Sequence, residues 1–487
     1  MTLARVVAQN ARERADGVAF AEVTAGPQLT WREYDERSDR LASALRGFGW
    51  ERGDRVAFQL PDGGDLHAVM LGIEKAGFVG VGIGARAGER EVEHLVSRTG
   101  ARTVITDVAP LLAGDGPTAR PPVDPARRAD ELWFLNSTSG TTGLPKIVMH
   151  DQDRWFAFHG FAQRIASFVP GDVFLSVLPA PFGFGLWTAH FTPAIVGASC
   201  VVCARFSAED VLAAIERYRV TVLAAVSTQF VMLLNSPALA DHDLSSLRVM
   251  FTGGEMVPYE RAREFETRTG ARVLQFYGSN ETGALSATTM FDTPEQRLRT
   301  AGCVIPEMQV RLLDPDTDAD ITTSGGPGVP AGKGPTLCLG YWDDDAANER
   351  LWTADGWMRM GDLATIDADG YLTVVGRTSD FIVRGGKNVS AAQVEDEVAT
   401  HPAVALCAAV AMPDETYGER VCVFAELRDG YDGLTLEDVT AHLAERGVGK
   451  ELWPERLVVL DELPRSSGGK VAKAELTAMA RTLADPT

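Results

Sequence analysis

Short apolar runs alternate along this chain with segments in which apolar residues recur every three or four positions. Runs such as 220–226, 248–252 and 272–277 are typical of buried strands, whereas 66–76 and 209–218 have helical spacing. Strands that alternate with helices favour parallel sheets, because a parallel crossover needs an intervening segment that is usually a helix. We therefore predict an α/β fold.

The pattern indicates a division near residue 377. Residues 370–375 form the last predicted strand of a long first part. The chain after that point has its own predicted strands (405–411, 420–426 and 456–459) and helices (391–400 and 436–446), and its length suits a small domain. We predict a large domain of residues 1–377 and a small domain of residues 378–487. A Gly- and Pro-rich stretch, 322–335, is predicted to be a loop within the first.

Composition narrows the possible partners and compartment. A net charge of -21 disfavours binding to nucleic acid and to anionic membranes, so any nucleotide site must be locally positive. Residues 1–17 have an amphipathic pattern without the apolar centre of a signal peptide. Cys200 and Cys203 have no second pair or nearby His for zinc, and we expect them in a buried strand. We expect a cytoplasmic monomer or homodimer.

A hydroxyl-rich segment follows the apolar run 132–135. Residues 137–146 read Ser-Thr-Ser-Gly-Thr-Thr-Gly-Leu-Pro-Lys. Hydroxyls donate to phosphate oxygens, glycines let backbone N–H groups approach an anion, and a lysine adds positive charge. No Gly-Lys-Ser/Thr follows, so this is not a Walker-type loop. We predict a phosphate-binding loop whose contacts come from Thr138, Ser139, Gly140, Thr141, Thr142, Gly143 and Lys146.

This segment closely resembles the phosphate-binding loop of the adenylate-forming superfamily, which includes acyl-CoA synthetases, aryl-acid ligases, luciferases and peptide-synthetase adenylation domains. Other segments resemble further motifs of that family, in the family's order: 277–281, 356–362, 376–377 and 464–470. The resemblance implies a large domain of parallel sheets flanked by helices, with a distorted β-barrel, and a small mobile α+β domain.

The same resemblance implies roles for individual residues. Glu281 would bind Mg²⁺, Asp362 would accept the ribose hydroxyls of ATP, and Lys470 would be the catalytic lysine. Arg377 would contact ribose and phosphate as a further catalytic group, while Tyr277 and Gly254 would lie near adenine. Asn280 stands where the family usually has Thr, and an amide N–H can still donate to phosphate.

A second half-reaction with a thiol is implied by segments after residue 377. Ser379 and Asp380 occupy the hinge about which family members rotate the small domain, although Asp or Lys is usual at the first position. Gly385 and Gly386 resemble the loop that lines the pantetheine tunnel. The implied acceptor is coenzyme A or the phosphopantetheine of a carrier protein.

The acyl pocket is predicted to be largely apolar. No Asp stands where amino-acid-activating relatives bind the substrate ammonium, which disfavours an α-amino acid. A hydrophobic carboxylic acid, cyclic or aromatic, is favoured. The predicted lining residues are Phe182, Phe184, Trp187, Gln229, Phe230, Gly253, Phe276 and Ser279.

The sequence therefore predicts an acid–thiol ligase that uses ATP, Mg²⁺ and coenzyme A. One alternative is an acyl- or aryl-AMP ligase that loads a carrier protein. Another is a catalytically silent nucleotide-binding protein, against which the presence of Glu281, Asp362, Arg377 and Lys470 argues. A third and less favoured alternative is an oxidative relative of luciferase.

Overall fold

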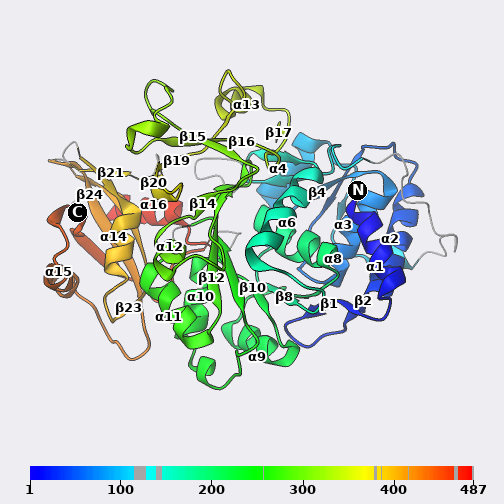
Figure 1. Cartoon of the computed structure of the whole chain (residues 1–487), viewed down its shortest axis with the longest axis horizontal. Helices are drawn as coiled ribbons and strands as arrows, with labels where there is room; N and C mark the ends of the chain where they lie inside the picture. Colours follow the sequence, from blue (N-terminus) through cyan, green and yellow to red (C-terminus); the bar gives the residue numbers. More distant parts are fainter. Residues whose placement is uncertain are drawn as a thin grey trace.

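The computed structural model describes residues 1–113, 128–138, 145–255, 257–377, 381–384, 387–414, 416–465 and 470–484. Within these residues, helices cover two large sheets of the first part of the chain, and a smaller sheet with its own helices follows toward the C-terminus (Figure 1). The predicted α/β fold is confirmed. Of the helices in these ranges, none has both the length and the apolar composition needed to span a bilayer.

The largest sheet has nine strands in the order β14-β13-β12-β11-β10-β8-β9-β1-β2. Neighbouring strands are parallel from β12 to β1 and antiparallel at both edges. Because the central strands are covered on both faces, they appear in the sequence as continuous apolar runs. Their bounds are β1 Val18–Glu22, β2 Leu29–Thr30, β8 Val173–Ser176, β9 Ser199–Val202, β10 Val222–Ala224, β11 Val249–Gly253, β12 Arg272–Ser279, β13 Gly283–Ala287 and β14 Cys303–Val304.

A second sheet has six strands in the order β17-β7-β6-β4-β3-β5. Strands β6, β4, β3 and β5 are parallel to one another, and β7 and β17 extend the sheet beyond β6 in antiparallel fashion. Their bounds are β3 Arg55–Phe58, β4 Val79–Gly82, β5 Val104–Ile105, β6 Phe134–Ser137, β7 Ile147–His150 and β17 Gly340–Tyr341.

The main hydrophobic core joins the two sheets. It contains Phe58 and Phe134 from the six-stranded sheet and Phe174 and Phe251 from the nine-stranded sheet, all buried. Helices of the first part are α1 Leu3–Glu13, α2 Trp31–Arg46, α3 Gly64–Ala76, α4 Glu89–Thr99, α5 Ala109–Leu112, α6 Asp153–Ala166, α7 Gly183–Gly185, α8 Thr192–Val196, α9 Ala208–Tyr218, α10 Ser227–Asn235, α11 Tyr259–Thr269, α12 Pro294–Arg299 and α13 Asp345–Leu351, with a π-helical segment at Leu186–Phe191 and 3-10 segments at Pro237–Ala240 and Thr322–Ser324. Cys200 lies in buried strand β9, as predicted, and Cys203 follows it; both thiols are free.

Two small antiparallel sheets correspond to the barrel part of the prediction. One contains β15 Gln309–Leu313, β16 Val329–Lys333 and β18 Met358–Arg359, and the other contains β19 Asp362–Ile366 and β20 Leu372–Arg377. The prediction that 322–335 is a loop is wrong for β16, which pairs with β15 on one side and β18 on the other. A Cβ at Gly332 would lie 2.4 Å from Leu285 Cδ2, so a larger residue there would force Leu285 to move.

The C-terminal part has a five-stranded sheet and separate core clusters. Its strands are β21 Phe381–Arg384, β22 Lys387–Ser390, β23 Val404–Asp414, β24 Gly418–Leu427 and β25 Arg456–Val459; its helices are α14 Ala391–Val398, α15 Leu436–Glu445 and α16 Lys473–Ala484, with a 3-10 segment at Lys450–Leu452. In Figure 1 this part, in orange and red, lies beside α10 and α11. The boundary at residue 377 remains a prediction.

Candidate active site

The hydroxyl-rich segment connects the antiparallel strands β6 and β7. Ser137 pairs with Ile147, and Thr138 N donates to Lys146 O at 3.0 Å, which closes the base of the connection. Ser139, Gly140, Thr141, Thr142 and Gly143 lie outside the described residues. The hairpin therefore anchors both ends of the predicted phosphate loop, and the exposed Lys146 marks its exit.

Tyr341 links Lys146 to Glu281. Its ring lies 4.7 Å from Lys146 Nζ, a cation–π distance, and its hydroxyl donates to Glu281 Oε1 at 2.7 Å. Burial, together with the neighbouring Glu281 charge, raises the pKa of Tyr341 above its usual range, so this hydroxyl stays a donor. The sequence did not single out Tyr341, which belongs to no recognised motif.

A buried polar network holds the turn that carries Glu281. Arg154, 2% exposed, donates from Nη2 to Asn280 O at 3.0 Å and to Glu281 O at 3.3 Å. Its Nη1 lies 2.6 Å from His150 Nδ1. A guanidinium can only donate, so His150 Nδ1 accepts and the ring proton is on Nε2.

His150 Nε2 then donates to Asn136 Oδ1 at 2.8 Å, and Asn280 Nδ2 donates to the same oxygen at 2.7 Å. Asn136 Nδ2 in turn donates to Pro181 O at 2.9 Å. Burial, with a smaller effect of the Arg154 charge, lowers the pKa of His150 well below its usual value, which keeps the ring neutral. In this structure Asn280 therefore makes a scaffold contact that ties the phosphate-loop strand, the Glu281 turn and the pocket segment together.

Replacing Arg154 with methionine is expected to lower the free energy of unfolding by about 3 kcal/mol, because buried acceptors on His150, Asn280 and Glu281 lose their donor. Arg164→Met on the same helix is the control, since Arg164 is half-exposed and pairs with Glu307 at the surface; it should change stability by under about 1 kcal/mol. Chemical denaturation followed by tryptophan fluorescence measures both. Equal effects of the two substitutions would contradict the scaffold role.

The predicted nucleotide contacts meet at the ends of β12 and β19. Tyr277 Oη donates to Asp362 Oδ2 at 2.9 Å, and both residues are buried. Asp362 pairs directly with Arg377 across the β19–β20 hairpin, although the Arg377 side chain lies outside the described part of the chain. The structure therefore brings together a tyrosine and a carboxylate that the sequence separates by 85 positions.

Lys470 crosses from the C-terminal part to this edge of the nine-stranded sheet. Its Nζ donates to Gly254 O at 2.7 Å. Gly254 has φ +78°, and a Cβ there would lie 2.8 Å from Lys470 Nζ, so both the backbone and the lysine's approach favour glycine. Gly253 pairs with Phe276 of the neighbouring strand.

Glu255 is an acidic neighbour of Lys470 that the sequence did not assign to the site. One of its oxygens accepts from Thr228 N at 3.2 Å. Burial raises the pKa of the Glu255 carboxyl, while the positive charge of Lys470 opposes that rise. Its position directly after the two glycines was the available signal.

Aromatic side chains cluster around Phe276, the strand partner of Gly253. Trp187 stacks on Phe184 with ring centroids 5.8 Å apart and meets Phe276 edge-on at 4.9 Å. Phe182 and Phe184 are partly exposed, whereas Trp187 is buried. An apolar wall of this kind suits a flat or bulky hydrophobic group.

Three other predicted pocket residues have different surroundings. Phe230 is fully buried in the helix-covered core, where its ring contacts Phe265, and its place in the pocket lining stays a prediction. Gln229 donates to Val177 O and accepts from Val226 N, both within the protein. Ser279 Oγ accepts from the backbone N–H of residues 281 and 282 and so shapes the Glu281 turn. Ser379, Asp380, Gly385 and Gly386 lie outside the described residues.

Asp62 holds the start of the pocket segment, because its Oδ1 accepts from Ala180 N at 2.9 Å. Burial raises its pKa to about 7 despite that hydrogen bond. The folded protein thus binds a proton here more tightly than the unfolded chain does, and stability should fall as pH rises from about 4 to about 7.

Asp62→Asn should retain the acceptor, remove this titration and stabilise the protein by about 2 kcal/mol at pH 8. Asp65→Asn is the control, because the carboxylate of Asp65 is partly exposed and pairs with Arg37. Melting temperatures of the three proteins between pH 5 and pH 8 measure the effect. A slope that Asp62→Asn leaves unchanged would contradict the assignment.

Family models and known proteins match this chain along most of its length. A family model described as AMP-binding enzyme matches residues 7–342, and one described as AMP-binding enzyme C-terminal domain matches residues 393–470. The chain is 30% identical to a medium-chain fatty-acid–CoA ligase of Escherichia coli (strain K12), over 96% of this chain and 88% of that protein.

It is 32% identical to a salicyl-AMP ligase / salicyl-S-ArCP synthetase of Mycobacterium tuberculosis (strain ATCC 25618 / H37Rv), over 97% of this chain and 89% of that protein. Among solved structures, ATP-bound MatB from Rhodopseudomonas palustris superposes with a TM-score of 0.87 at 25% identity, covering 99% of this chain and all of that one.

Proposed function

Since this chain belongs to the AMP-binding enzyme family, we propose that it activates a hydrophobic carboxylic acid with ATP and transfers the acyl group to a thiol. In the first step a carboxylate oxygen attacks the α-phosphorus of ATP, an acyl–AMP bond forms and pyrophosphate leaves. In the second step a thiol sulfur attacks the acyl carbon, loses its proton and displaces AMP. The observation that carries the proposal is the contact of Lys470 with Gly254, beside the Tyr277–Asp362 pair.

The residues support this chemistry by alignment and charge. Two anions must approach each other, so catalysis depends on positioning and electrostatic stabilisation. In our proposal Lys470 bridges the acid and the α-phosphate, Lys146 and the loop hydroxyls hold the triphosphate, and Asp362 accepts the ribose hydroxyls. A general base is unnecessary in the first step, because a carboxylic acid is already ionised near pH 7.

Mg²⁺ is the metal that the proposal requires. Among the residues that the structure describes, no group of three or more His, Cys, Asp or Glu could enclose a metal ion. Glu281 offers one carboxylate, of which one oxygen accepts from Tyr341. That set suits Mg²⁺, which binds through one or two carboxylates together with phosphate oxygens and water. When bound, Mg²⁺ would offset the charge of the triphosphate.

A panel of acids, scored by ATP–pyrophosphate exchange, tests the proposal. We expect exchange with aromatic or other bulky apolar acids and none with α-amino acids. Absence of exchange across a broad panel, with ATP binding intact, would favour a silent nucleotide-binding protein.

The thiol acceptor has two candidates, because the relatives include both a fatty-acid–CoA ligase and a salicyl-AMP ligase / salicyl-S-ArCP synthetase. We propose coenzyme A as the first. Incubation of the enzyme with ATP, an active acid and coenzyme A should yield acyl-CoA. Accumulation of acyl-AMP without acyl-CoA would favour the carrier protein.

A further inference from the structure

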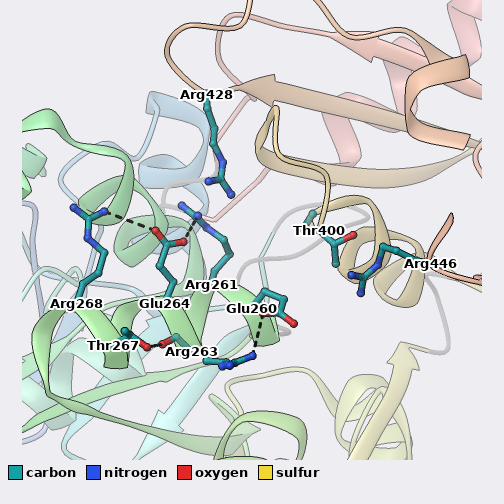
Figure 2. A pocket seen from close by; sticks show the side chains of 10 residues that line it. Glu260, Arg261, Arg263, Glu264, Thr267, Arg268, Thr400, Arg428 and Arg446 are labelled. Carbon is teal, nitrogen blue, oxygen red and sulfur yellow. Dashed lines mark hydrogen bonds and ion pairs between the residues drawn. The ribbon is translucent and has the colours of Figure 1, made fainter. Parts of the chain in front are cut away.

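A pocket of about 510 Å³ lies between α11 and the C-terminal part, and it contains no residue of the candidate active site. One wall is α11, and the other is made by residues that follow α14, β24 and α15 (Figure 2). The lining residues are Glu260, Arg261, Arg263, Glu264, Thr267, Arg268, Ala399, Thr400, Arg428 and Arg446.

The pocket has the opposite charge to the chain as a whole. Five of its ten lining residues are arginines and two are glutamates, whereas the net charge of the chain is -21. Because arginine stays protonated at neutral pH, this surface is locally positive within an acidic protein.

Arg261 is a buried arginine of this pocket. It is 3% exposed, and its two Nη groups contact Glu264 and Asn235. Nothing in the described chain accepts a hydrogen bond from its Nε. Burial and the nearby Arg428 lower the pKa of Arg261 to about 10.

Arg428 adds a second guanidinium from the other wall. Its Nε donates to Val404 O at 3.0 Å, and Figure 2 shows the side chain extending toward Arg261. No described carboxylate forms an ion pair with it. Glu264 is shared, because it also lies 3.7 Å from Arg268 Nη1. The Glu264 carboxylate thus pairs with two guanidinium groups, those of Arg261 and Arg268.

We propose that this pocket binds a multiply charged phosphate anion, for which pyrophosphate is the model, and that the anion joins α11 to the C-terminal part. Guanidinium groups match phosphate oxygens in charge and in hydrogen-bond geometry, and the volume is within the range of small-molecule sites. The choice of pyrophosphate rests on the proposed function, which releases it. The charge and the geometry of the pocket are independent of the proposed function.

An anion held from both walls would favour the arrangement of the two parts seen here. In that arrangement Lys470 contacts Gly254, as the proposed adenylation step requires. Residues on both walls should therefore contribute to binding: Arg268 on α11 and Arg428 on the C-terminal part.

Calorimetric titration without Mg²⁺, at fixed ionic strength, tests the proposal with inorganic phosphate, pyrophosphate and ATP as separate probes. Arg268→Gln and Arg428→Gln should each weaken pyrophosphate binding about tenfold, the cost of one charged hydrogen bond. Glu260→Gln, which removes a competing charge from the rim, should tighten it. Arg272→Gln, an exposed arginine outside the pocket, is the control and should change nothing.

Lys146→Ala separates this pocket from the predicted nucleotide cleft. Lys146→Ala should weaken the binding of an anion in the cleft, and the pocket variants should not. The proposed function of the cleft can therefore be disproved while the proposal for the pocket holds. Parallel weakening of ATP binding by the pocket variants would identify the ligand as a nucleotide-borne phosphate; weakening of pyrophosphate alone would identify a free anion. Unchanged pyrophosphate affinity in both arginine variants would overturn the proposal. An effect confined to Arg268→Gln would overturn the bridging role.

Discussion

Replacing Lys470 with alanine is expected to slow acyl-adenylate formation by at least about 10²–10³-fold, the usual cost of one preorganised electrostatic group. The reason is geometric, because Lys470 Nζ is 2.7 Å from Gly254 O, at the end of the strand that neighbours the one carrying Tyr277. The rate of ATP–pyrophosphate exchange with a good acid measures the loss. The KM for ATP should change much less, since Asp362 and Lys146 remain.

Lys473→Ala is the matched control. Lys473 lies three positions downstream at the start of α16, and its Nζ pairs with Glu395 at 2.7 Å within the C-terminal part. Its loss should leave exchange within about threefold of the wild type. If Lys470→Ala and Lys473→Ala behaved alike, the lysine near the cleft would have no special role in adenylation.

The elements of the large sheets could be predicted from local patterns. The run 248–252 anticipated β11, and 209–218 anticipated α9 almost to the residue, because buried parallel strands and amphipathic helices leave different periodicities. The order in which β11, β10 and β8 lie side by side could not be predicted in this way, since strand order depends on contacts between distant segments.

The candidate site also contains residues that the sequence identified and residues that it missed. Motif resemblance identified Tyr277, Asp362 and Lys470. In the fold, Tyr277 contacts Asp362 and Lys470 contacts Gly254. Tyr341 gave no signal, because its role depends on β17 pairing with β7 beside the loop. Arg154 gave none either, because arginine is mostly exposed and its burial here depends on contacts with residues 280 and 281, far along the chain.

Phe230 shows what proximity to a motif leaves open. An aromatic residue close to a ligand-binding segment can face either side of its helix, and periodicity does not indicate which side meets the substrate. In α10 its ring lies 5.8 Å from that of Phe265 in α11, within one core cluster.

Glu281→Gln is expected to lower the rate of adenylation by about 10²-fold at limiting Mg²⁺. Glutamine can still accept the hydrogen bond from Tyr341 Oη, which spans 2.7 Å in the wild type, so the turn should keep its shape. Only the negative charge is lost, and with it the carboxylate that Mg²⁺ prefers. Raising the Mg²⁺ concentration should recover part of the rate in a titration of pyrophosphate release.

Tyr341→Phe separates charge from positioning. It removes the hydrogen bond to Glu281 but keeps a ring beneath Lys146, 4.7 Å from Nζ in the wild type, and it should cost about tenfold at most. Its deficit should not depend on Mg²⁺ concentration, whereas that of Glu281→Gln should. If the two variants shared the same Mg²⁺ dependence, Glu281 would act through its hydrogen bond to Tyr341 and not as a metal ligand.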